Sequence, residues 1–87
     1  MTTLQKDIIK LLFNGHCIAV YRNDHYRVRD SKHSPVRSFY KATFDVLSPF
    51  LRKNKNGFLV IDKNAIRQQR NNSWIKQYYK TQTAPKK

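Results

Sequence analysis

Apolar residues near the start of the chain recur at the spacing of an amphipathic helix. Residues three or four positions apart share one helical face. Four apolar residues follow this spacing: Leu4, Ile8, Leu11 and Leu12. Thr2 and Gln5 fit a capping box. Asn14 and Gly15 favour an end to the helix, because glycine adopts the left-handed cap conformation without steric cost. The sequence therefore predicts a helix that stops at this pair.

The segment from Cys17 to Arg29 has the pattern of a β-hairpin, and two registers fit it. A two-residue turn at Asn23-Asp24 is suitable because both residues tolerate positive φ. Its apolar face would consist of Cys17, Ala19, Tyr21, Tyr26 and Val28. A three-residue turn would instead gather Ile18, Val20, Tyr26 and Val28. In both registers Arg27 and Arg29 lie on the face opposite Tyr26 and Val28.

The middle of the chain predicts a polar loop, a short strand and a helix. Residues 30–35 form the loop, and residues 36–40 form a third strand. Residues 42–53 follow helical spacing, with one side made of Phe44, Leu47 and Leu51. Pro49 conflicts with this helix because it lacks a backbone N–H. Ser48-Pro49 alternatively starts a separate short turn, with Ser48 as its cap.

The last third of the chain predicts a strand followed by two helices. Asn56-Gly57 favours a turn before an apolar strand over residues 58–61. Asp62 is a suitable cap for a helix over residues 63–70. The polar run 71–73 interrupts it, and Ser73 caps a last helix to about Lys80. The broad apolar face of that helix consists of Trp74, Ile75, Tyr78 and Tyr79.

These elements predict an α+β fold in the order α-β-β-(β)-α-β-α-α, with a β-hairpin and a C-terminal helix pair. The length of 87 residues fits one small basic domain over residues 1–80. Residues 81–87 are predicted to form a disordered basic tail. The helix pair resembles a helix-turn-helix unit in outline.

The charge of the chain is strongly unbalanced. Eighteen Lys and Arg residues face five acidic residues, all of them Asp, and the formal net charge is +13. Residues 1–51 carry eight basic and four acidic residues, a net of +4. Residues 52–87 carry ten basic and one acidic residue, a net of +9. Self-repulsion of this size destabilises a compact chain. The composition therefore favours a polyanionic partner, contacted mainly by the C-terminal part.

Basic residues of the two C-terminal helices form the first candidate site. Lys63, Arg67 and Arg70 lie at i, i+4 and i+7 and share one helix face. Lys76 and Lys80 lie at i and i+4 on the last helix. Such a stripe can follow a phosphate backbone, which requires charge and reach rather than one set of side chains. The alternative is a solvated face, although such faces normally mix both signs.

The hairpin forms the second candidate site. Arg22, Arg27 and Arg29 could make a basic β-ribbon that contacts a nucleic-acid groove or backbone. A purely solvating role is the alternative, because edge strands often carry such charge. Aromatic residues of the last helix could stack on unpaired bases. At helical spacing, however, core packing is the commoner role, and this applies to Trp74, Tyr78 and Tyr79.

Residues with metal-binding or catalytic chemistry are few and scattered. Four potential ligands match no common zinc spacing, so neither a metal nor a cofactor is expected: His16, Cys17, His25 and His33. Five separated Asp residues do not predict a nuclease metal cluster. Two glycines are too few for a P-loop or a dinucleotide motif. We therefore expect no enzymatic activity.

Three hypotheses about function follow. The first is a non-catalytic protein that binds DNA through its C-terminal helices, with help from the hairpin. The second is an RNA-binding protein. The third is an interaction protein of a phage or mobile element that docks on an acidic protein surface, since positive charge also speeds that encounter. One cysteine and no long apolar segment favour a cytoplasmic protein without a membrane anchor, in a bacterial host cell or at its nucleoid.

Overall fold

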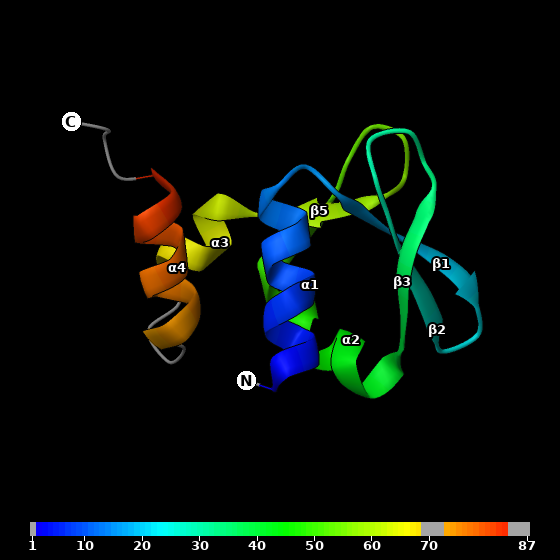
Figure 1. Ribbon diagram of the computed structural model, residues 1–87, viewed down its shortest axis with the longest axis horizontal. Coiled ribbons are helices and arrows are strands. Elements are labelled where there is room, and N and C mark those ends of the chain that lie inside the picture. The colour runs from blue at the N-terminus through cyan, green and yellow to red at the C-terminus, as the bar shows by residue number, and fades with distance from the viewer. Residues whose placement is uncertain (1, 69–72, 84–87) are drawn as a thin grey trace.

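The computed structural model describes residues 2–68 and 73–83, and Figure 1 shows how its elements are arranged. The helices are α1 (Thr3–Phe13), α2 (Lys41–Leu47), the 3-10 turn η1 (Ser48–Phe50), α3 (Lys63–Gln68) and α4 (Ser73–Thr83). The strands are β1 (Cys17–Arg22), β2 (His25–Arg29), β3 (Pro35–Tyr40), β4 (Leu51–Lys53) and β5 (Leu59–Ile61). The predicted α+β class and order of elements are confirmed, with η1 and β4 added after α2.

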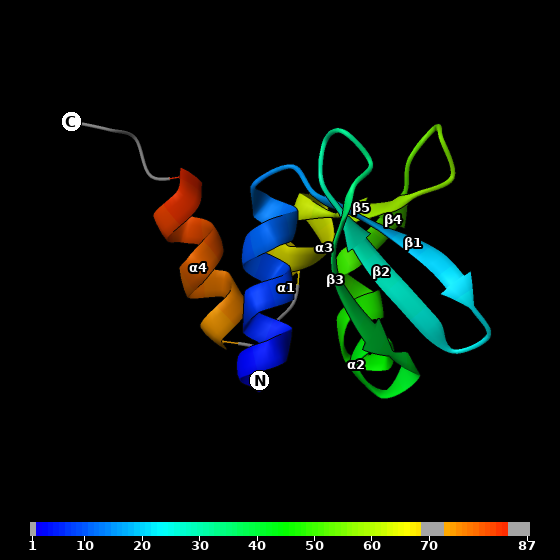
Figure 2. The same ribbon diagram turned by 45° about the vertical axis from the view of Figure 1, so that its right-hand side comes forward.

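The strands form one antiparallel sheet with helices on one side. The strand order is β3-β2-β1-β5-β4, so β1 joins the N-terminal hairpin to the β4–β5 pair. Figures 1 and 2 show α1, α2 and α3 on one side of the sheet, and α4 beyond α1. The described helices leave the opposite face of β1, β2 and β3 uncovered. We call this the open face.

Buried side chains of the sheet and the helices form one cluster. The sheet contributes Ile18, Val28 and Phe39, and the other elements contribute Ile8, Ile9, Leu12, Leu47, Phe50, Ile66 and Ile75. Residues alternate between the two faces of a strand. Because Val28 is buried against the helices, its neighbours Arg27 and Arg29 point to the open face, as predicted.

Three predicted helix ends, marked by Thr2, Gly15 and Asp62, are confirmed. Ser48 and Ser73, which are predicted to be caps, are instead the first residues of η1 and α4. The backbone N–H of Gln5 donates to Oγ1 of Thr2 over 3.2 Å, and the N–H of Thr2 donates to Oε1 of Gln5 over 3.0 Å. Gly15 has a φ of +95° just after α1. At α3 the carboxylate of Asp62 accepts hydrogen bonds from two backbone N–H groups, those of Asn64 and Ala65. These short polar signals set where the helices start and stop.

The hairpin combines features of both predicted registers. Arg22 pairs with His25 across the two-residue turn, where Asp24 has a φ of +61°. A β-bulge between Val20 and Arg22 then shifts the register by one residue. Val20 therefore pairs with Tyr26, and the apolar face is the one expected from a three-residue turn: Ile18, Val20, Tyr26 and Val28. The extra residue of the bulge is Tyr21.

Two predicted helix ends are wrong. The helix expected over residues 42–53 ends at Leu47, and Pro49 lies in η1, as the alternative with a separate turn predicted. Residues 51–53 form β4, because Leu51 pairs with Ile61 instead of continuing a helical face. Helix α4 continues to Thr83, so the first residues of the expected disordered tail are helical. Residues 69–72 and 84–87, including the expected break at 71–72, lie outside the described residues.

Candidate nucleic-acid interface

Pairing of β1, β2 and β3 brings basic and aromatic side chains together on the open face. Arg22 pairs with His25, and His25 pairs with Tyr40, so the three lie side by side across the strands. In the next row Arg27 lies between Ala19 and Ser38. The bulge places Tyr21 beside these rows. We call five of these residues the open-face cluster: Tyr21, Arg22, His25, Arg27 and Tyr40.

The rings of the open-face cluster contact one another at the end of the sheet. His25 stacks on Tyr40, with 4.8 Å between ring centroids and an interplanar angle of 16°. Tyr21 meets His25 edge-on, with centroids 5.3 Å apart. Tyr40 remains 69% exposed and Tyr21 remains 42% exposed. Since His25 covers only one face of Tyr40, the other face of that ring is open to solvent.

The two arginines of the cluster lie against Tyr21. The guanidinium carbon of Arg27 is 3.5 Å from the Tyr21 ring centroid, and that of Arg22 is 5.1 Å away. Such cation–π contacts orient the guanidinium and leave N–H groups at its edge free to donate. The structure therefore presents two positive groups beside exposed rings. This arrangement suits an aromatic ligand that carries negative charge.

Few acidic groups neutralise this charge. Among the described residues, the one salt bridge joins the guanidinium of Arg37 to the carboxylate of Asp7 over 3.3 Å. Both side chains are more than a third exposed, so the pair contributes little to stability. The acid nearest the open-face cluster in sequence is Asp24, in the β1–β2 turn. The cluster therefore keeps a net positive charge.

Arg29 lies at the other, covered end of the open face. Its Nη1 donates to the backbone oxygen of His33 over 3.0 Å, and its Nε is buried. The His33 ring stacks on Phe58 at 5.2 Å, so the β2–β3 loop lies against the β4–β5 loop. Cys17, which pairs with Arg29, is buried there, and burial raises the pKa of its thiol. Arg29, a predicted contact residue, thus holds a loop and stands apart from the open-face cluster.

The structure brings together three residues of the predicted C-terminal stripe. Arg67, Lys76 and Lys80 line a hollow of about 190 Å³ between α3 and α4, beside Ile66 and Tyr79. Nε of Arg67 donates to the Tyr79 hydroxyl over 3.0 Å, so this arginine also joins the two helices. Arg70, which also belongs to the predicted stripe, lies outside the described residues. These three positive charges surround one hollow and can therefore contact neighbouring phosphates. Arg67 also takes part in the packing of α3 against α4.

Aromatic residues of α4 pack against the rest of the molecule. Tyr78 and Tyr79 lie 5.2 Å and 6.0 Å from the Phe13 ring of α1, between ring centroids. Trp74 stacks on Tyr78 at 5.3 Å. All three are partly buried against the core. This agrees with the expected packing role and makes these rings poor platforms for a base.

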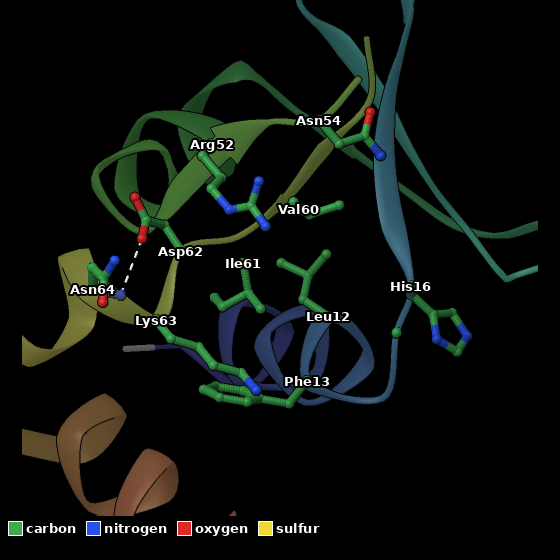
Figure 3. A pocket seen from close by; sticks show the side chains of 11 residues that line it. Leu12, Phe13, His16, Arg52, Asn54, Val60, Ile61, Asp62, Lys63 and Asn64 are labelled. Carbon is green, nitrogen blue, oxygen red and sulfur yellow. Dashed lines mark hydrogen bonds between the residues drawn. The ribbon is translucent and has the colours of Figure 1, made fainter. Parts of the chain in front are cut away.

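Lys63 lies in a different hollow, of about 580 Å³, which Figure 3 shows from close by. Its walls come from the end of α1, from β4 and β5, and from the start of α3. Arg52 and Lys63 both line it, beside one carboxylate, that of Asp62. That carboxylate already caps α3. The hollow is therefore lined by two cationic side chains, by one carboxylate engaged in capping and by the imidazole of His16.

The two candidate surfaces lie far apart. Figure 1 shows α4 at one end of the long axis and the β1–β2 turn at the other. The molecule extends 41 Å along that axis. If the hairpin assists the C-terminal helices, as the sequence predicts, it does so from a separate surface. Each surface has to be tested separately.

No protein-family model, curated protein or solved structure matches the chain. No helix within residues 2–68 and 73–83 is long and apolar enough to cross a membrane. Over the same residues, no three His, Cys, Asp or Glu side chains gather to hold a metal ion. The open-face cluster and the hollow between α3 and α4 are therefore the observations that bear on function.

Sequence reasoning missed three residues of the open-face cluster: Tyr21, His25 and Tyr40. Their signal is present only in strand pairing, because Tyr40 reaches His25 through the β2–β3 register. Phe39 and Tyr40 are consecutive strand residues, so one points to the buried face and the other to the exposed face. This alternation could have identified Tyr40 as an exposed ring. The bulge that places Tyr21 has no such marker in the sequence.

Proposed function

We propose that this chain is a non-catalytic protein that binds nucleic acid through its open-face cluster. The observation that carries the proposal is the combination of Arg22 and Arg27 with exposed rings on the open face, which the described helices leave uncovered. Among the described residues no carboxylate forms a salt bridge with these arginines, so phosphates can supply the negative charge, and bases can supply aromatic faces. Neither partner requires a catalytic group at this site.

The basic residues around the hollow between α3 and α4 support a second contact with nucleic acid, and we propose DNA as the polymer bound there. Arg67, Lys76 and Lys80 surround one hollow, and two of them lie one turn apart on α4. Such an arrangement can contact successive phosphates of a duplex without reading bases. RNA is the competing polymer, and a direct comparison separates the two.

The test is a set of binding curves with labelled duplex DNA, single-stranded DNA and RNA at several salt concentrations. If the chain contacts about four to six phosphates, the slope of log K against log salt on duplex DNA is expected to be about −3.6 to −5.4. Single strands are expected to give a shallower slope, about −0.7 for each contacted phosphate. A slope near zero, or no binding to any polymer, contradicts the proposed function.

A further inference from the structure

We infer that the open-face cluster takes a single-stranded polynucleotide, with one unpaired base stacked on the free face of Tyr40. This inference rests on the proposed function and deepens it, because it names the strand state of the ligand and the ring that contacts it. The ligand chemistry is an aromatic base joined to phosphates, which DNA and RNA single strands share.

The Tyr40 ring is placed to receive a base on one of its faces. One face is stacked on His25 at 4.8 Å, and the side chain as a whole is 69% exposed. A base that lands on the other face would extend an existing stack rather than form an isolated contact. Stacking of this kind tolerates any base, since every base has a π face.

The backbone that carries the Tyr40 ring is held in place before binding. The backbone N–H of Lys41 donates to the carbonyl of Asp24 over 3.0 Å, which fastens the end of β3 to the β1–β2 turn. Tyr40 is the last residue of β3 and immediately precedes α2. Because the backbone at Tyr40 is fixed and one ring face already stacks on His25, Tyr40 loses less freedom when a base stacks on it, so binding costs less entropy.

Positive charge lies on the same face of the sheet as the Tyr40 ring. Arg22 lies in the same row as Tyr40, with His25 between them, and Arg27 lies in the next row. Both arginines lie on the same side of Tyr40, toward β1 and β2, so a strand that runs from the stacked base across the sheet brings its phosphates toward them. In a duplex the bases stack on one another and pair, so their faces are closed to Tyr40. The arrangement therefore favours a single strand over a duplex.

The test compares Tyr40→Leu with Tyr40→Phe, using the full chain. Phenylalanine keeps the aromatic face, whereas leucine keeps apolar bulk without it. The probes are a short oligothymidylate, the matching oligouridylate, an abasic strand of equal length and a duplex. Tyr40→Leu is expected to bind both base-bearing strands about 5- to 150-fold more weakly than the unchanged chain, and Tyr40→Phe to stay within about twofold. Circular dichroism confirms that both variants fold, as expected at so exposed a position.

The abasic strand separates stacking from charge. It keeps the phosphates, so the inference expects Tyr40→Leu and the unchanged chain to bind it equally. Equal binding of Tyr40→Leu and Tyr40→Phe to oligothymidylate and oligouridylate overturns the inference, and so does a loss seen with the duplex alone. In either case salt-dependent binding by the unchanged chain would leave the proposed function standing. If the unchanged chain binds none of the probes, the proposed function fails as well.

Discussion

Replacing Phe39 with alanine is expected to remove about 3–5 kcal/mol of folding free energy, the usual cost of deleting a buried aromatic side chain. Phe39 is 2% exposed and stacks on Tyr26 at 5.5 Å, and Tyr26 stacks on Phe44 of α2 at 4.1 Å. This row of rings joins β3, β2 and α2. Small domains are stabilised by about 5–15 kcal/mol in total, so the loss is severe.

Urea denaturation followed by circular dichroism measures this loss. Val36→Ala is the matched control, because Val36 lies on the same strand but is 48% exposed. The control is expected to stay within about 0.5 kcal/mol of the unchanged chain. A Phe39→Ala loss under about 1 kcal/mol would show that the β3 side of the core is loosely packed, contrary to the described packing.

Removing the two arginines of the open-face cluster is expected to weaken nucleic-acid binding at least about tenfold. A charge-assisted hydrogen bond contributes about 1.5–3 kcal/mol, and about 1.4 kcal/mol corresponds to a factor of ten. Arg22→Gln with Arg27→Gln should also reduce the size of the salt slope on a single strand by about 1.4, if each arginine contacts one phosphate. Binding curves at several salt concentrations measure both effects.

Two other double variants remove the same amount of charge elsewhere. Lys76→Gln with Lys80→Gln changes the hollow between α3 and α4, and Lys53→Gln with Lys55→Gln changes β4 and the loop after it. The open-face pair is expected to cause the largest loss on a single strand. Equal losses from all three pairs would mean that binding follows net charge and has no preferred surface.

The sequence predicts this fold well where local signals agree with packing. Thr2, Gly15 and Asp62 mark helix ends by their own chemistry, and the structure uses all three. The hairpin shows the limit of such signals. Its turn residues and its apolar pattern demand registers that differ by one residue, and only the bulge at Tyr21 satisfies both. Likewise, Leu51 fits a helical spacing but pairs with Ile61, a partner distant in the chain.

The candidate site was less predictable than the fold for the same physical reason. The distribution of basic residues along the sequence predicts a binding site on the C-terminal helices. There the structure uses Tyr79 and Arg67 partly to hold the helices together. The open-face cluster depends on three strands meeting in one register. It also depends on the β2–β3 loop, which accepts a hydrogen bond from Arg29, while the guanidinium of Arg27 lies on Tyr21. Neither feature follows from spacing alone.

The central claim is that nucleic acid contacts the open face, and a backbone NMR titration tests it most directly. The full chain, labelled with nitrogen-15, is titrated with a short oligothymidylate while amide signals are followed. The account predicts that the largest shifts fall on β1, β2 and the end of β3, around the open-face cluster. Shifts confined to α3 and α4, with the β1–β3 amides unmoved, would contradict it.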